Sequence, residues 1–525
     1  MQKILMVNEA SYRNSGYSRY GRELLKRLYK SGKYKIAELA CSHSLSSPDC
    51  VREAQKIPWK VYPAVPNIND KNIMNAYNCN HLNKFGKMFF ERTCLDFKPN
   101  VVFSIRDFWM DSYIDESPFR DYYNFIHLAP VDSEPQNTSW VDMYKNCDVL
   151  LTYNNWSKKV LEGYGLKVHA AAPAKAPDSF RPMHKIECKA SLGLPVTGKI
   201  IGTVMRNQPR KLFDELFTAF RKFLEETDKE VYLYCHTGFP DSWCDIPDLL
   251  LRHGITNKVF FTYKCMNPKC KAIDARRYSD IPTQCYKCNN ISSKLCNMDN
   301  QVSDDELAFV FNCFDIYVQY ASMEGLGMPV IEAAACGVVP LAVDYSAMSS
   351  VVRDCKGFPI KVASKSIEVE SGRYKASPDI NHTVELFKMA LDNSESFGQA
   401  SYKACVENFN WDNTAVKWMS AIDHVSPKKS WDSPMSITYI PDFNQHDNLT
   451  NRQYVDWLYE KVLCKPYLKN SYMAHKMVSD LCLGQTQAID GVPNQYIRYD
   501  RRMAYNKLAN LANEKNLWEQ ERTNG

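Results

Sequence analysis

The chain centres on the segment SMEGLGMPVIEAAACG, which occupies residues 322–337. Two glutamates, Glu324 and Glu332, stand eight positions apart in it. Glu324 precedes a turn that contains Gly325 and Gly327, and glycine adopts a positive φ without steric penalty. The turn therefore allows the backbone to approach a ligand closely.

The second half of this segment predicts a short helix from about residue 327 to residue 335. Pro329 suits the first helical turn, and Gly337 suits the position just after the helix. The unpaired N–H groups and the dipole at the helix start favour an anion such as a phosphate. Glu332 would point from the second turn toward the same ligand, where a carboxylate accepts two ribose hydroxyls. The alternative is a buried helix with a solvated glutamate at each end.

The pattern resembles the donor-site signature of retaining, nucleotide-sugar-dependent glycosyltransferases of the GT-B fold. Family four, the glycosyl transferases group 1, matches best, and phage-type enzymes share the fold. The resemblance covers about residues 1–423, with a firm core from 196 to 350. It implies an α/β chain of two doubly wound Rossmann-like domains that face each other across a cleft. It also implies that catalysis needs no metal.

Length and composition set the general class of the protein. A chain of 525 residues with 45% hydrophobic residues should form two or three domains with full cores. A net charge of +5 argues weakly against a dedicated nucleic-acid coat. The N-terminus is too quickly polar for a signal peptide, and no apolar run of membrane-spanning length occurs. These features, with many scattered cysteines, predict a cytoplasmic protein without a membrane span.

The first domain is predicted to begin with a buried strand at residues 4–7, a glycine-containing loop and an amphipathic helix. The loop lacks G-x-G-x-x-G, which weakens the rival interpretation of a dinucleotide-dependent oxidoreductase. The family resemblance places Gly16 beside the donor diphosphate. The alternative for Gly16 is a plain turn at the start of a helix.

Asp132 follows the apolar run 125–131 at a strand end. The segment resembles a P-[VI]-D-G-E-P pattern that lines the inter-domain cleft in part of the family, with Ser133 in place of the usual glycine. Asp132 could orient or deprotonate the acceptor hydroxyl. An Asx turn before Pro135 is the structural alternative.

The second domain is predicted to open with a strand at residues 199–204, followed by a basic loop. In the family, an Arg and a Lys five positions apart clamp the donor diphosphate, and Arg206 and Lys211 match this spacing. The departing diphosphate carries extra charge in the transition state, which two cations would stabilise. His236 lies where relatives hold the base or ribose. A solvated basic turn is the alternative for the loop.

An insert of about 38 residues, 263–300, interrupts the second domain. It contains two cysteine pairs, which suit a closed tetrahedral thiolate zinc site better than disulfides in a cytosolic chain. The predicted ligands are Cys265, Cys270, Cys285 and Cys288. Cys296 could replace one of them. The insert is locally basic, with seven Lys and Arg against three Asp.

The predicted domain plan has four parts. They are an acceptor domain at 1–190, a donor domain at 191–405, a crossover helix at 406–425, and a linker with a helical C-terminal module at 426–525. The C-terminal module carries basic residues interleaved with tyrosines, a mixture suited to phosphates and stacked bases. These residues are Tyr496, Arg498, Tyr499, Arg501, Arg502 and Tyr505.

The predicted activity is transfer of a sugar, with retention, from a UDP-sugar or another nucleoside diphosphate sugar to an acceptor hydroxyl. Arg206 and Lys211 would stabilise the leaving group, with help from the backbone N–H groups near Leu326 and Gly327. Glu324 would hold sugar hydroxyls. The acceptor is a glycan or modified DNA containing 5-hydroxymethylcytosine. The rival from another class is a non-catalytic sugar-nucleotide or nucleic-acid binding protein.

Overall fold

The computed structural model describes residues 1–431 except 14, 242, 298 and 370, and then residues 451–458, 486–488 and 496–498. The chain divides into two units, residues 1–428 and 429–525. Several tyrosines and arginines of the basic C-terminal run lie outside the described residues. They are Tyr499, Arg501, Arg502 and Tyr505.

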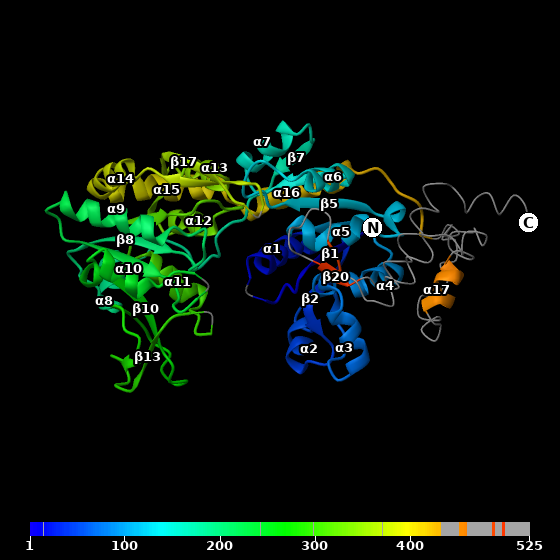
Figure 1. Cartoon of the computed structure of the whole chain (residues 1–525), viewed down its shortest axis with the longest axis horizontal. Helices are drawn as coiled ribbons and strands as arrows, with labels where there is room; N and C mark the ends of the chain where they lie inside the picture. The colour runs from blue at the N-terminus through cyan, green and yellow to red at the C-terminus, as the bar shows by residue number, and fades with distance from the viewer. Residues whose placement is uncertain are drawn as a thin grey trace, which may run out of the picture. The chain divides into compact units, whose positions relative to one another are not determined.

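The first domain, whose elements run from blue to cyan in Figure 1, is built on a seven-stranded sheet. The strand order is β3-β2-β1-β4-β5-β6-β7. All six pairings are parallel, so the carboxyl ends of the strands lie at one edge of the sheet. The strands are β1 (Gln2–Glu9), β2 (Tyr34–Ser44), β3 (Lys60–Val65), β4 (Val101–Ser104), β5 (Asn124–Ala129), β6 (Val149–Thr152) and β7 (Val168–Ala171). The helical segments are α1 (Gly16–Lys30), α2 (Pro48–Ala54), α3 (Lys71–Asn78), η1 (His81–Phe85), α4 (Lys87–Phe97), α5 (Phe108–Asp115), η2 (Arg120–Tyr122), α6 (Thr138–Asn146) and α7 (Asn155–Gly163).

The second domain contains a nine-stranded sheet in the order β12-β13-β10-β9-β8-β14-β15-β16, with β11 paired to β10. Its α/β part is parallel, whereas the strands of the insert pair antiparallel. The strands are β8 (Lys199–Val204), β9 (Val231–His236), β10 (Val259–Cys265), β11 (Ile273–Arg276), β12 (Thr283–Gln284), β13 (Ile291–Leu295), β14 (Ile316–Gln319), β15 (Val339–Val343) and β16 (Phe358–Ile360). The helical segments are α8 (Lys185–Ser191), α9 (Phe213–Glu225), α10 (Ile246–Arg252), η3 (Thr256–Lys258), α11 (Asp304–Phe311), α12 (Met328–Ala335), α13 (Ala347–Asp354), α14 (Ile380–Asp392) and α15 (Ser394–Asn408).

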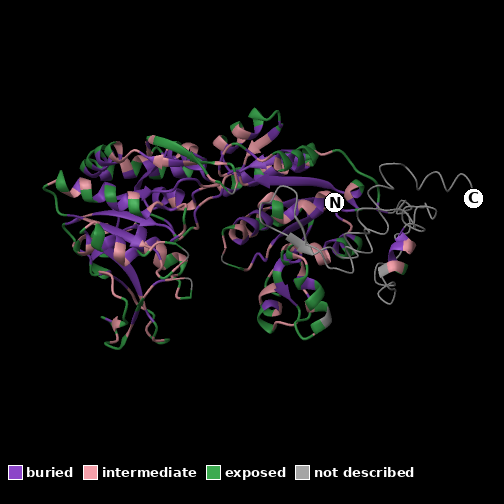
Figure 2. Ribbon diagram, in the orientation of Figure 1, coloured by how far each residue is buried: buried purple, intermediate pink, exposed green. Residues whose placement is uncertain are grey.

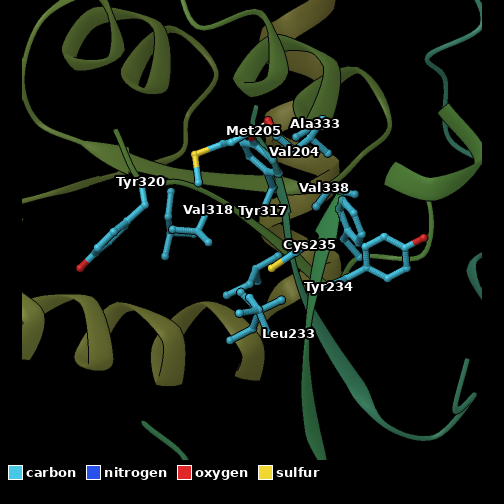
Figure 3. Packing of buried hydrophobic residues seen from close by; sticks show 14 of the residues in the cluster. Val204, Met205, Leu233, Tyr234, Cys235, Tyr317, Val318, Tyr320, Ala333 and Val338 are labelled. Carbon is cyan, nitrogen blue, oxygen red and sulfur yellow. Dashed lines mark hydrogen bonds between the residues drawn. The ribbon is translucent and has the colours of Figure 1, made fainter. Parts of the chain in front are cut away.

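The core of the second domain fixes the strands that lead to the predicted donor loop. Side chains of β8, β9, β14 and α12 pack together in one buried cluster (Figure 3). Gly202 on β8 leaves room for the ring of Phe314, because a β-carbon at this position would lie 2.1 Å from that ring. The central strands of both sheets are buried, whereas the outer strands β3, β12 and β13 are partly exposed (Figure 2). The prediction of two doubly wound α/β domains is confirmed.

Two elements of the second half of the chain connect back to the first domain. Helix α16 (Trp411–His424) packs into the first core, where the Trp418 indole donates to the hydroxyl of Tyr20 at 2.9 Å. The antiparallel pair β17 (Val362–Ile367) and β18 (Tyr374–Pro378) forms a hairpin. Its end reaches the first domain, since the Tyr374 amide donates to the carbonyl of Glu134 at 2.8 Å.

The insert and the C-terminal region differ from the sequence-based expectation. The sequence predicts a polar loop in the insert, but β10 to β13 form an antiparallel ribbon, here called the cysteine ribbon (residues 259–296). β10 is mostly apolar and buried, whereas β11, β12 and β13 have at most five residues each, so their periodicity is too brief to recognise. The C-terminal region contains the expected helical part in α17 (Asn451–Trp457) and also an unexpected strand pair, β19 (Thr486–Ala488) with β20 (Tyr496–Arg498). Among the described helices, none has the length and apolar character to span a bilayer.

Candidate functional site

The central glycine-rich segment lies at the carboxyl edge of the second sheet, between β14 and α12. Gly327 adopts φ +75° directly before α12, a conformation that favours glycine. Ser346 Oγ accepts a hydrogen bond of 2.9 Å from the Glu324 amide, and the Glu324 carbonyl accepts one of 3.1 Å from Ala347. These bonds fix the loop, and the start of α12 has no side-chain cap.

Glu324 meets the basic loop that follows β8. Lys211 Nζ forms an ion pair with Glu324 Oε1, and Arg210 Nη2 lies 3.7 Å from Glu324 Oε2. Burial and then the positive charge of Arg210 lower the pKa of Lys211, and the contact with Glu324 opposes this shift. The structure therefore brings the predicted cation and the predicted carboxylate into direct contact.

Arg206 is the more accessible member of the predicted clamp. Its side chain is 47% exposed and forms a two-point ion pair with Asp241, with distances of 3.1 and 3.3 Å. The bidentate geometry orients the guanidinium while leaving part of it open to solvent. Sequence reasoning did not identify Asp241, because it lies 35 positions from Arg206.

Glu332 is buried on the second turn of α12, with 5% of its surface exposed. Burial raises its pKa to about 7, against the attraction of Arg19, and Asp304 adds to the rise. Arg19 and Asp304 form an ion pair that joins α1 to α11. A carboxyl with this pKa changes its charge close to neutral pH.

His236 ends β9 at the same edge of the second sheet. Its Nδ1 lies 2.8 Å from the hydroxyl of Thr262, and burial lowers its pKa to about 4. The imidazole is therefore neutral at pH 7. It offers one N–H donor and one acceptor nitrogen.

The predicted acceptor-side residue, Asp132, contacts the second domain. Its Oδ1 accepts from Arg373 Nη1 at 2.8 Å, and Arg373 lies at the end of the β17–β18 hairpin. A β-carbon built on Gly325 would lie 4.0 Å from the β-carbon of Asp132, and Asn154 Nδ2 donates to the Gly325 carbonyl at 3.0 Å. Asp132 therefore lies beside the glycine-rich loop.

Gly16 and Asp107 complete the first-domain side of this region. Gly16 is the first residue of α1, and a β-carbon there would meet no atom within 4 Å. The hydroxyl of Tyr17 donates to Asp107 at 3.1 Å. Burial raises the pKa of Asp107 to about 6, and the neighbouring charge of Asp132 adds to the rise. Asp107 follows β4 by three residues, and its position just after a strand is the sequence signal that could have identified it.

Leu326 and Met328 are the side chains of the central segment that pack against both domain cores. Both are half-buried. Their contacts place the glycine-rich turn between the two sheets rather than on the outer surface of one domain. The predicted donor residues of the second domain thus lie close to the predicted acceptor residue of the first.

The four cysteines predicted to bind zinc come together in the cysteine ribbon. Their sulfur atoms all lie within 4.8 Å of one another. Sγ of Cys265 lies 3.6 Å from that of Cys288, and Sγ of Cys270 lies 3.7 Å from that of Cys285. A tetrahedral zinc with bonds of about 2.3 Å separates its sulfur ligands by about 3.8 Å. The geometry fits such an ion.

The two turns of the cysteine ribbon have matching backbone conformations. Lys271 directly follows Cys270 with φ +50°, and Asn289 directly follows Cys288 with φ +59°. Cys296 is buried but does not belong to the four-sulfur group. Burial raises the pKa of its thiol to about 12. The group of four sulfur atoms is thus complete without Cys296.

Part of the chain matches a known protein family. Residues 292–370 match the family described as Glycosyl transferases group 1. D-inositol 3-phosphate glycosyltransferase of Mycobacterium leprae is 27% identical over 201 residues. The match covers 36% of this chain and 37% of that protein, so the chain spans little more than a third of its length.

Solved structures match most of the chain. Sucrose-phosphate synthase from Thermosynechococcus elongatus superposes with a TM-score of 0.55 at 15% identity, covering 81% of this chain and 98% of that one. HepE from Anabaena, in complex with UDP and glucose, gives a TM-score of 0.53 at 9% identity, with coverages of 81% and 100%. The fold is GT-B. At these identities the likeness describes the fold, and the activity has to be argued from the site.

Proposed function

We propose that the protein is a retaining glycosyltransferase that transfers a sugar from a nucleoside diphosphate sugar to an acceptor hydroxyl. The contact of Lys211 and Arg210 with Glu324, beside the uncapped start of α12, carries this proposal. It combines cations for a diphosphate with a carboxylate for sugar hydroxyls. The partial match to Glycosyl transferases group 1 includes Glu324 and α12 and supports glycosyl transfer.

The donor diphosphate would lie between the basic loop and α12. Arg206 and Lys211 would offset the negative charge that grows on the diphosphate as its bond to the sugar breaks. The N–H groups at the start of α12 would bind the same charge, because no side chain caps them. Glu324 would then exchange part of its contact with Lys211 for hydroxyls of the sugar. This arrangement places the leaving group on the second domain.

The nucleoside would occupy the region of Glu332 and His236. Glu332 would accept the two ribose hydroxyls, for which its carboxylate form is needed. HepE from Anabaena was solved with UDP, and uracil is therefore the first base to test. We propose a UDP-sugar as the donor.

The acceptor would approach from the first domain. Oδ1 of Asp132 is held by Arg373 and by Ser133, while its side chain remains 35% exposed. The other carboxylate oxygen could orient the acceptor hydroxyl. That hydroxyl would attack the anomeric carbon from the face that the diphosphate leaves, and its proton would pass to the departing phosphate oxygen. The configuration would then be retained without a covalent enzyme intermediate.

The acceptor class divides into glycans and modified DNA. The cysteine ribbon exposes several lysines, which favours a polyanion, although thiolate ligands of a bound metal would also attract these cations. Much of the basic C-terminal run lies outside the described residues. A glycan is therefore the first acceptor class to test, and DNA containing 5-hydroxymethylcytosine is the second.

The direct experiment is UDP release from a panel of UDP-sugars, with oligosaccharides or modified duplex DNA as acceptors. We expect one donor to be consumed with an acceptor, and NMR of the product should show the anomeric configuration of the donor. Nucleotide binding without turnover on any acceptor would favour the non-catalytic alternative. Binding of no nucleotide sugar would contradict the proposal.

We further propose that the cysteine ribbon binds one structural zinc ion. When bound, zinc would link the two turns of the ribbon through four thiolates and leave no open coordination position. Protein purified without chelator should contain about one zinc per chain by elemental analysis. Cys285→Ser should lower this content, whereas Cys296→Ser, a matched change of a buried cysteine outside the group, should not. Absence of zinc from both wild-type and C296S protein would contradict the assignment.

A further inference from the structure

The side chain of Thr262 connects the cysteine ribbon to the region proposed for the nucleotide. Thr262 is fully buried on β10, three residues before Cys265. Its hydroxyl lies 2.9 Å from the hydroxyl of Tyr234 and 2.8 Å from Nδ1 of His236. Both partners come from the neighbouring strand β9. One hydroxyl therefore joins two polar side chains inside the sheet.

The hydrogen-bond requirements of these groups determine the direction of the network. The phenol of Tyr234 is fully buried, and Thr262 is its hydrogen-bond partner among the described residues. A buried donor without an acceptor is costly, so the Tyr234 hydroxyl donates to Thr262. Thr262 then has its own proton to donate to Nδ1 of His236. The neutral imidazole carries its proton on Nε2 as a result.

The cysteine ribbon holds this network from its other side. The Cys296 amide donates to the Thr262 carbonyl at 2.9 Å, and β10 continues from Thr262 to the predicted ligand Cys265. The chain that leaves the cysteine ribbon after Cys296 also packs on the loop after His236. A β-carbon built on Gly238 would lie 3.1 Å from Cα of Asn297. Loss of order in the ribbon would therefore release both Thr262 and the loop at Gly238.

We infer that Thr262 is a positioning residue that fixes His236 to donate its Nε2–H to an oxygen of the nucleotide, and that metal binding in the cysteine ribbon stabilises this arrangement. The ligand class is an acceptor oxygen, which a uracil carbonyl, a ribose hydroxyl or a phosphate provides. The inference rests on the proposed function for the location of the nucleotide. The tautomer of His236 can be tested without any nucleotide.

The first test uses Thr262→Val, with Thr262→Ser as the conservative variant. Thr203→Val is a matched control, because Thr203 is also fully buried in this sheet but its hydroxyl has no partner among the described residues. We expect T262V to weaken UDP binding in calorimetry about fivefold, as loss of one oriented hydrogen bond predicts. T262S and T203V should bind as the wild type does. Equal affinity of T262V and wild type would overturn the inference.

The second test reads the tautomer by NMR of protein with nitrogen-15 in its histidines, with His236→Gln used to assign the signal. The wild-type spectrum should show a proton on Nε2 and none on Nδ1, and T262V should show a mixture of tautomers. A proton on Nδ1 of His236 in the wild type would overturn the proposed direction of the hydrogen-bond network. This readout decides the tautomer even if no nucleotide binds.

The third test addresses the metal. Stripping the protein with a chelator should weaken UDP binding about tenfold, within the usual range for coupled sites, and one equivalent of zinc should restore it. Equal UDP affinity with and without zinc would overturn the coupling while leaving the proposed function intact. If zinc-loaded protein binds no nucleotide in the same titration, the proposed function fails, and the coupling fails with it.

Discussion

Replacing Lys211 by methionine is expected to lower kcat about 30- to 1,000-fold in the sugar-transfer assay. This range corresponds to about 2–4 kcal/mol of lost transition-state stabilisation, as found when a group that stabilises developing charge is removed. Methionine preserves most of the side-chain volume and removes the charge. The measurement is kcat with the donor and acceptor that the panel identifies.

The same substitution leaves the Glu324 carboxylate with Arg210 at 3.7 Å and with the neutral amide of Gln319 at 3.2 Å, so it should also lower stability by about 3 kcal/mol. The double variant K211M/E324Q should regain most of this stability but not the activity. Lys189→Met is the matched control, because Lys189 is also buried and pairs at 2.8 Å with Asp315, which precedes β14 and so lies at the opposite end of that strand from Glu324. It should lose stability and keep kcat. Unchanged turnover of folded K211M would remove Lys211 from the leaving-group site.

Replacing Glu332 by glutamine is expected to stabilise the protein above pH 7 and to weaken nucleotide binding. The folded-state pKa of about 7 exceeds the ordinary value of 4.5, so ionising the buried Glu332 carboxyl lowers the free energy of unfolding. This loss of stability is absent below pH 4.5 and grows as pH rises toward 7. At pH 8 it amounts to about 3 kcal/mol, which E332Q would remove. Denaturant unfolding at pH 4.5, 6 and 8 measures this dependence.

Glu38 provides a matched control for this experiment. It is buried in the first domain, and burial raises its pKa to about 7 as well, while Ser11 donates to it at 3.0 Å. E38Q should change the pH dependence of stability in the same direction and leave UDP affinity unchanged. E332Q should weaken UDP binding at pH 8 by about tenfold, the effect of one lost charge-assisted contact. Equal UDP affinities of E332Q and E38Q would contradict the ribose assignment.

Local sequence patterns were sufficient to predict the central loop with its helix and the group of four cysteines. Glycines, a proline and an apolar run predicted α12 within one residue of its observed start at Met328. The short spacing within each cysteine pair predicted a group of four cysteines, and their sulfur atoms lie together in the structure. In both cases, the interacting residues lie close together in the chain.

The electrostatic partners of the site could not be predicted in this way. Arg373 meets Asp132 across 241 positions, and Arg19 meets Asp304 across 285. Such pairs depend on how two domains come together, which no local periodicity encodes. An arginine at the end of a hairpin is common, so the sequence offers no reason to assign Arg373 to the site. Its contact with Asp132 is what places it there.

The β17–β18 hairpin has a consequence for the motion of the two domains. Three contacts join this hairpin of the second domain to the first domain. They are the hydrogen bond from Arg373 to Asp132, the ion pair of Lys365 with Glu134 at 3.2 Å, and the hydrogen bond from the Tyr374 amide to the Glu134 carbonyl. Hinge opening would have to break these bonds together, and water would replace them. We therefore expect the open conformation to be a minor population in the absence of substrate. On the proposed function, these contacts would supply part of the free energy of closure, and substrate would enter during brief opening events.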